Sequence, residues 1–290
     1  MSKRPRGFIA NYKPRTNAAL LEQVQIVLDE YSNQLPLTLR QIFYRLVGKY
    51  NYEKTELAYK RLCEMLNKAR RGGSIPFDHI RDDGNTVISP RLWDSGNEWL
   101  TAIRRSAKFV RLSPWLDQSV YVEVICEAGG MAPMLARVAD PFGVTVRSGG
   151  GFDSLTAKHD LARHYANQGK PVVVLHVGDY DPSGEALWTN LNEDVSAFCT
   201  AMGGEMSVRR IAVNVLQKEE FDLPTAPPKK SDRRSIFTDD FTVQAEALPP
   251  DVLQQIVHDA IEAELDLDAL EATRAAEIAM REELTAQLSN

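Results

Sequence analysis

The sequence contains little cysteine. Only three are present, Cys63, Cys126 and Cys199, and they lie far apart without forming a Cys-x-x-Cys pair. This spacing argues against a disulfide framework and against a structural zinc site. Such sparse, unpaired cysteine is typical of a protein kept in the reducing cytoplasm.

Long apolar runs and a nucleotide-binding loop are also missing. No run of 18 or more apolar residues occurs, and the basic start MSKRPRGF is not followed by the apolar core of a signal peptide. No Gly-x-x-x-x-Gly-Lys-Ser/Thr motif occurs, so any ATPase function would belong to a separate subunit. We expect a cytoplasmic protein whose 290 residues form two domains.

The charge is unevenly distributed along the chain. The net charge is −6, yet residues 1–111 carry an excess of nine basic side chains and the rest an excess of fifteen acidic ones. A basic half on an acidic protein is typical of a nucleic-acid-binding domain joined to another module. A solvated charged face is the alternative interpretation.

The N-terminal part has the pattern of three helices and a hairpin. Residues 17–33 show helical apolar spacing, Thr38 and Gln41 form a capping box for a second helix, and residues 53–73 form a third. Residues 77–89 follow as a hairpin with its turn at Asp-Asp-Gly-Asn. This order predicts a winged helix-turn-helix domain.

In a winged helix-turn-helix domain the basic third helix is the element that contacts the duplex. The domain is expected over residues 1–95, followed by a connecting helix within 96–117. The candidate contacts to double-stranded DNA are Lys60, Arg61, Lys68, Arg70 and Arg71.

The second half alternates strands with helices, which predicts a parallel sheet with helical crossovers. The expected strands are 119–127, 143–151 and 170–179, and the expected helices are 131–139, 153–168 and 183–202. This domain extends over residues 118–248. An acidic helical segment, 249–290, completes the chain. The fold class is therefore α/β.

Two aspartates, Asp179 and Asp181, stand at the carboxyl end of an apolar strand. Ligands of parallel α/β sheets gather at this edge, and residues two apart on a strand share a face. Both carboxylates are then expected to point at one cation, and Mg²⁺ is the ion that such oxygen ligands suit. Glu127, at the end of an earlier strand, is expected to complete the site, whereas Glu123 lies mid-strand and is expected either to be paired or to face a partly wet side of the sheet. The alternative is a solvated Asp-Pro-Ser-Gly turn.

Tyr44 is a candidate nucleophile in the second helix. The apolar stripe of that helix passes through Leu39, Phe43 and Leu46, and Tyr44 lies off its centre. Arg40 precedes Tyr44 by four residues, so its guanidinium can hold a phosphate beside the phenol oxygen. The alternative is a half-buried tyrosine next to an unrelated surface arginine.

These motifs carry a resemblance to a known family. A strand ending in Glu followed by a strand ending in DYDPSG, with TLRQIFY upstream at residues 38–44, resembles the Toprim fold of the type IIB topoisomerases. That family comprises the topoisomerase VI A subunit and the meiotic double-strand-break protein, and the chain is most similar to its stand-alone mini-A members. The similarity covers roughly residues 16–225.

The resemblance implies a fold, a reaction and partners. It implies that residues 118–248 are a Toprim domain and that Tyr44 attacks DNA to form a 5′-phosphotyrosyl link. Glu127, Asp179 and Asp181 would hold Mg²⁺, or Mn²⁺ in its place. In the family one protomer's tyrosine works with the other's metal site, which implies a homodimer, with or without a separate ATPase subunit, on nucleoid DNA.

Two other functions remain open at this point. In a hydrolytic Toprim nuclease, a metal-activated water attacks and Tyr44 is only structural. In a non-catalytic DNA-binding protein, the fold serves dimerisation or regulation. Covalent protein–DNA adducts would distinguish the tyrosine transesterase from the hydrolytic nuclease. Metal-dependent cleavage of any kind would distinguish both enzymes from the non-catalytic DNA-binding protein.

Overall fold

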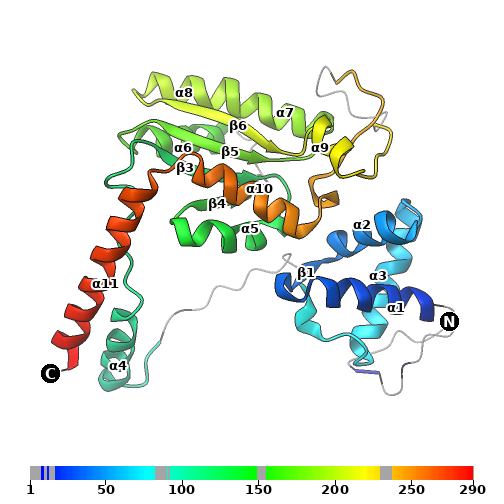
Figure 1. The fold of residues 1–290 in the computed structure, drawn as a ribbon, viewed down its shortest axis with the longest axis horizontal. Helices are drawn as coiled ribbons and strands as arrows, with labels where there is room; N and C mark the ends of the chain where they lie inside the picture. The colour runs from blue at the N-terminus through cyan, green and yellow to red at the C-terminus, as the bar shows by residue number, and fades with distance from the viewer. Residues whose placement is uncertain are drawn as a thin grey trace.

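The structure is a computed structural model that describes residues 8–9, 12, 17–81, 90, 92–148, 155–228 and 237–289. Its fold is α/β, with a helical N-terminal region and a parallel sheet covered by helices on both faces (Figure 1). The bounds of the three N-terminal helices, α1 (Ala18–Glu30), α2 (Leu39–Tyr50) and α3 (Glu56–Arg71), confirm the three predicted helices.

Helix α2 begins at the capping box expected from the sequence. The Thr38 hydroxyl accepts from the Gln41 backbone N–H at 3.1 Å, and the Gln41 side chain accepts from the Thr38 N–H at 2.9 Å. Two backbone donors that a helix leaves without partners are thereby satisfied. This cap fixes where the TLRQIFY segment starts and how Arg40 and Tyr44 are oriented.

The predicted hairpin over 77–89 is only partly within the described residues. Phe77–His79 form a 3-10 turn, and only β2 (Ile80–Arg81) is extended, where it pairs in parallel with β1 (Leu37–Thr38). The extended segment thus begins three residues later than expected. Arg70 explains the turn, because its guanidinium donates to the carbonyl oxygens of Phe77 and Ile80 and lies 4.7 Å from the Phe77 ring. The predicted turn at 82–85 lies outside the described residues.

The sheet contains four parallel strands in the order β4-β3-β5-β6. Three of them, β3 (Tyr121–Cys126), β4 (Thr145–Ser148) and β5 (Val172–Val177), lie within the predicted strands. The fourth, β6 (Met206–Ala212), was not predicted, because alternating exposed and half-buried positions through its two arginines give it no continuous apolar run.

Two helical layers cover the sheet. Helices α5 (Ala132–Ala139) and α10 (Pro250–Glu262) lie on one face (Figure 1). The other face carries α6 (Leu155–Ala166) and the nearly continuous run of α7 (Pro182–Asn190), a π-helical turn and α8 (Ser196–Ala201).

The core follows the two-residue period of a strand. Along β3, Val122, Val124 and Cys126 pack toward α5 and α10, whereas Tyr121 and Ile125 pack toward α6 and α8. Both faces of the strand are therefore buried, as expected of a parallel sheet.

The remaining helices complete the chain. These are α4 (Gly96–Ala107), α9 (Val215–Glu220) and α11 (Leu267–Ser289). Helix α10 carries a buried apolar stripe that includes Leu253, Val257 and Ile261. Among the described residues, no helix combines the length and apolar character needed to cross a bilayer.

Candidate active site

Three acidic side chains follow the two central strands. Because β3 pairs in parallel with β5, with Cys126 opposite Val177, both strands end at the same edge. Glu127 lies at that edge, where its backbone N–H donates to Val177 at 2.9 Å. The strand order diverges here, since β4 follows β3 on one side and β5 lies on the other. Parallel sheets bind ligands at such a divergence.

Glu127 and Asp179 are linked through the backbone. The Glu127 carboxylate accepts from the Asp179 N–H at 3.0 Å, and the Asp179 carboxylate accepts from the Ala245 N–H at 2.8 Å. Burial, followed by the charge of Glu127, raises the pKa of Asp179 to about 7. Burial, together with the charge of Asp181, also raises the pKa of Glu127. Two acids with raised pKa values at one edge favour a cationic ligand between them.

Two glycines allow this close approach. A Cβ added at Gly184 would lie 2.0 Å from the Asp179 carbonyl oxygen and 3.0 Å from a Glu127 carboxylate oxygen. A Cβ at Gly178 would lie 2.5 Å from the ring of His176 and 3.3 Å from the same Glu127 oxygen. Any side chain at either position would displace the carboxylate, so the glycines are part of the site.

Asp181 is placed differently from the sequence-based expectation. Strand β5 ends at Val177, so Asp179 and Asp181 lie beyond it and strand alternation does not put them on one face. One Asp181 carboxylate oxygen instead accepts from the N–H groups of Ser183, at 2.9 Å, and Gly184, at 2.8 Å, which caps α7. The prediction that Asp179 and Asp181 share one face of the strand was therefore wrong. The three carboxylates nevertheless lie close enough for their charges to interact.

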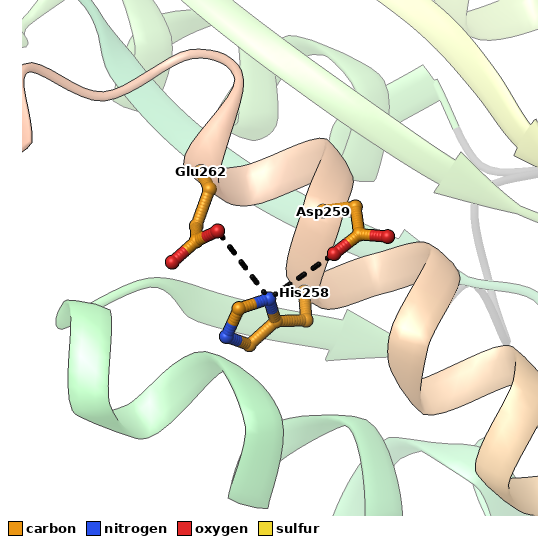
Figure 2. A group of neighbouring side chains, drawn as sticks. All are labelled: His258, Asp259 and Glu262. Atoms are coloured by element: carbon orange, nitrogen blue, oxygen red, sulfur yellow. Dashed lines mark hydrogen bonds and ion pairs between the residues drawn. The ribbon is translucent and has the colours of Figure 1, made fainter.

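A separate acidic group lies on α10. His258, Asp259 and Glu262 form the one trio in the described part of the chain whose ligand atoms all lie within 4.8 Å of one another. Figure 2 shows one ring nitrogen of His258 facing both carboxylates, at 3.3 and 3.7 Å. These contacts join the three side chains to one another without a metal, and the trio lies on a helix separate from Glu127 and Asp179.

Tyr44 is buried, contrary to the off-core position expected from the helix wheel. Its side chain is 5% exposed, and its hydroxyl donates to the side-chain oxygen of Gln244. The next residue, Ala245, donates to Asp179, so the tyrosine and the acid contact adjacent residues of one segment. Burial, followed by the charge of Asp179, raises the pKa of Tyr44 far above its usual value.

We call residues 244–247 the strap. Besides those two contacts, Glu246 of the strap accepts from the Thr38 hydroxyl at 3.3 Å and lies 3.9 Å from the Arg40 guanidinium. The backbone oxygen of Ala247 accepts from Arg45. The strap therefore fixes the whole inner face of α2 against the acidic edge of the sheet. Helix periodicity could not show this, because the cover comes from 200 residues further along the chain.

Two cations lie beside Tyr44. Arg40 is on the solvent side of α2, and its charge opposes the rise in the Tyr44 pKa. The Lys54 ammonium lies 5.5 Å from the Tyr44 ring centre and donates to the Pro224 carbonyl at 2.9 Å. Burial lowers the pKa of Lys54 to about 8, against the opposing charge of Asp179. Lys54 precedes α3 and faces the tyrosine.

A further residue of the site comes from the unpredicted strand. Arg210 of β6 donates to the backbone oxygen of Asp179 and to Glu185. His176 of β5 is fully buried, and burial together with the charge of Arg210 lowers its pKa to about 3, so its ring is neutral. Arg210 thus fixes the acidic loop through the backbone. An arginine in an alternating, exposed stretch gave no signal that could have identified it.

The candidate DNA contacts on α3 differ in their surroundings. Lys60 and Arg61 form exposed ion pairs with glutamates at 3.0 Å, and Arg71 donates to an asparagine one turn away. Arg70 is engaged with backbone carbonyls of the segment that follows α3. Lys68 is exposed. Lys60, Arg61 and Lys68 are thus exposed and Arg71 is partly exposed, whereas Arg70 has a structural role.

No protein-family model matches the chain, and no curated protein is significantly similar to it.

Proposed function

We propose that this protein cleaves DNA by tyrosine transesterification. In this proposal residues 1–95 act as a winged-helix domain and residues 118–248 as a Toprim domain, like the topoisomerase VI A subunits that the motifs resemble. The observation that carries the proposal is the strap, because its adjacent residues Gln244 and Ala245 contact Tyr44 and Asp179. The proposed nucleophile and the proposed cation ligand thus contact adjacent residues, although they are far apart in sequence.

Each chain residue has a defined part in the reaction. The Tyr44 oxygen attacks the phosphorus of a phosphodiester, a new O–P bond forms, and the bond from phosphorus to the 3′ oxygen breaks. The phenol proton passes to solvent, and the departing 3′ oxygen takes up a proton. Arg40 and Lys54 would hold the phosphate and stabilise the phenolate, whose formation burial opposes.

The carboxylates fit a divalent cation. Oxygen ligands suit Mg²⁺, and the raised pKa values of Glu127 and Asp179 reflect buried negative charge that a cation would neutralise. When bound by Glu127, Asp179 and Asp181, Mg²⁺ or Mn²⁺ would supply positive charge against the phosphate. Asp181 would offer its second oxygen, since the hydrogen bonds from Ser183 and Gly184 reach only the first.

The covered tyrosine requires a movement before cleavage. At 5% exposure, the Tyr44 hydroxyl cannot meet a phosphate while it donates to Gln244. DNA would have to displace the strap, which would also free the Asp179 carboxylate from Ala245. Substrate binding would then expose the nucleophile and the acidic site together.

The proposal includes a homodimer on nucleoid DNA, with or without an ATPase subunit. The family resemblance implies that Tyr44 works with the partner's carboxylates, whereas the strap places it beside Asp179 of its own chain. Mixing Tyr44→Phe with Asp179→Asn protein decides between these arrangements. Restored nicking means that the two protomers share one site, and inactive mixtures mean that each chain cleaves alone.

The central test uses supercoiled plasmid with Mg²⁺ or Mn²⁺, with products analysed before and after protease digestion. Wild-type protein should remain covalently attached to 5′ ends after denaturation, and Tyr44→Phe should give neither cleavage nor adduct while still binding DNA. Tyr52→Phe is the matched control, because it also removes a tyrosine hydrogen bond, that to Ala58 at 3.0 Å. If Tyr44→Phe cleaves DNA as fast as wild type and no adduct forms, Tyr44 is not the nucleophile.

The burial of Tyr44 favours a second candidate, the hydrolytic nuclease, in which water attacks and the tyrosine only packs. That enzyme would cleave without protein-linked ends, and Tyr44→Phe would leave its rate unchanged. A DNA-binding homodimer without catalysis, which the helix-capping role of Asp181 favours, would bind plasmid and leave it intact with either metal.

A further inference from the structure

Strand β5 contains one polar side chain, His176, which is the last residue but one of the strand. Every other side chain of β5 is Val or Leu, and the whole strand is buried. Helices cover both faces of this sheet, and strands in such a position are normally apolar throughout. The ring of His176 is 0% exposed, so contact with water does not explain a polar residue here.

Both ring nitrogens of His176 are buried and lack a hydrogen-bond partner among the described residues. The lowered pKa of His176 leaves the ring neutral, with one N–H donor and one acceptor nitrogen. Nearly all buried polar groups are hydrogen-bonded, and one that is not points to a water or an ion at that place. An unprotonated imidazole nitrogen is also the commonest metal ligand in proteins. The ring is therefore a candidate for binding a cation.

Gly178 brings the ring of His176 close to Glu127. A Cβ added at Gly178 would lie 2.5 Å from Cε1 and 2.8 Å from Nε2 of the ring, and 3.3 Å from Oε2 of Glu127. One point thus lies near both the ring edge that carries Nε2 and the carboxylate. The glycine leaves a space there that the Cβ of any other residue would fill. The unpartnered nitrogen therefore belongs to the same edge of the sheet as the three acids.

Arg210 of β6, which lies opposite His176 in the strand register, is directed toward the acidic loop. Its two terminal nitrogens donate to the Glu185 carboxylate and to the Asp179 backbone oxygen. The charge of the guanidinium is thus matched by Glu185. Arg210 holds the loop in place and gives no hydrogen bond to the ring of His176.

We propose that Nε2 of His176 is a fourth ligand of the cation that the three carboxylates hold, and that this nitrogen makes the site select a divalent transition metal over Mg²⁺. Mg²⁺ is bound through oxygen, whereas imidazole nitrogen suits transition metals. The inference rests on the cation site of the proposed function and narrows the class of metal that occupies it. Mn²⁺ is the probe, because it is paramagnetic and belongs to the proposed reaction.

The first test detects the nitrogen directly. The full chain is loaded with Mn²⁺ without DNA, and electron spin-echo envelope modulation reports nitrogen nuclei bound to the metal. Wild-type protein should show coupling to an imidazole nitrogen, and His176→Leu should not. The matched control is His258→Leu, because His258 also lies beside two carboxylates (Figure 2). Mn²⁺ bound by His258→Leu protein without nitrogen coupling would overturn the proposal. This result is decisive even where His176→Leu does not fold, since the control chain retains His176.

The second test compares metal affinity with stability. His176→Leu should weaken Mn²⁺ binding about tenfold or more, as expected for a lost ligand, and should change Mg²⁺ binding little. Without metal, the variant should unfold at the same urea concentration as wild type or at a higher one, because two unpartnered polar groups leave the core. A histidine that serves only packing would give lower stability with unchanged Mn²⁺ affinity, and that result would overturn the proposal.

Neither test uses DNA or turnover, so this inference and DNA cleavage can fail separately. Asp179→Asn should abolish tight Mn²⁺ binding, and binding equal to wild type would overturn the cation site and the role of His176 together. Mn²⁺ binding that depends on Asp179 but shows no nitrogen coupling would overturn the role of His176 and keep the cation site. Nitrogen-coupled Mn²⁺ in a chain that leaves plasmid intact would support the ligand and reject the cleavage.

Discussion

Glu123 and Glu127 belong to the same strand region, four residues apart, yet their surroundings are opposite. Glu123 is fully buried but has partners, because Arg147 lies 2.7 Å from its carboxylate and Tyr165 donates to it at 3.0 Å. Glu127 is held near two other acids, with burial raising its pKa. Removing an acid that is buried with a matched cation destabilises the fold, whereas buried acids that lie together with raised pKa values are candidates for a ligand site.

The largest effect expected from this comparison is on activity. Asp179→Asn should reduce metal-dependent cleavage about a hundredfold or more, because the cation loses a charged ligand. Thermal unfolding without metal should show no loss of stability, since a buried repulsion disappears. The measurement is plasmid cleavage across a Mg²⁺ titration, and wild-type rates in the variant would rule out Asp179 as a ligand.

Glu123→Ala should have the opposite effects, a loss of stability without a loss of cleavage. The free energy of unfolding should fall by about 3 kcal/mol, since the Arg147 and Tyr165 side chains lose a buried partner. Cleavage per folded molecule should stay at the wild-type level. Urea denaturation gives the stability, and a cleavage defect that persists in fully folded Glu123→Ala protein would contradict the division between the two glutamates.

The stability of metal-free protein should depend on pH through Asp179. Its pKa is raised to about 7 in the folded state, above the value of about 3.9 of a free aspartate. The folded state therefore holds the proton more tightly, and stability falls as pH rises from 4 to 7, by at most about 1.4 kcal/mol per unit. Asp179→Asn should flatten this slope in a urea series, and saturating Mg²⁺ should offset it. An unchanged slope in the variant would assign the effect to other groups.

The smallest expected effects concern two cations of α3, the exposed Lys68 and the hydrogen-bonded Arg70. Lys68→Ala should reduce the salt dependence of DNA binding by about 0.9 in the log–log slope, for one lost phosphate contact, without loss of stability. Arg70→Ala should instead lower stability, since its carbonyl partners lose their donor. Fluorescence anisotropy at several salt concentrations measures the first effect, and thermal melts measure the second. Equal effects of both variants on DNA binding would contradict the assignment of Lys68 to DNA contact and of Arg70 to a structural role.

The sequence predicted the parts of the site that depend on local pattern. Strand ends placed Glu127 and Asp179 together, because parallel neighbours end at one edge. The mid-strand position of Glu123 left a paired or a partly wet side chain open, and the structure shows the paired one. The capping box located the start of α2 to the residue. These inferences needed only periodicity and turn chemistry.

The errors concern contacts between distant segments. Helical spacing placed Tyr44 off the core, but the strap covers it from the far end of the chain. Strand spacing aligned Asp181 with Asp179, but the strand ends earlier and Asp181 caps α7 instead. Arg210 was missed for the same reason, since its role depends on a neighbouring strand and not on its own segment.

The strap also has a consequence for synthesis of the protein. Apart from Ala247, every buried residue of the N-terminal apolar cluster lies between Leu21 and Ile80. That cluster can therefore assemble while most of the chain is still being translated. Synthesis of the 200 residues from Tyr44 to Gln244 takes on the order of 10 to 40 s at about 5 to 20 residues per second. During this interval the residues that cover Tyr44 have not yet been made, so the tyrosine can be covered only after residues 244–247 have been synthesised.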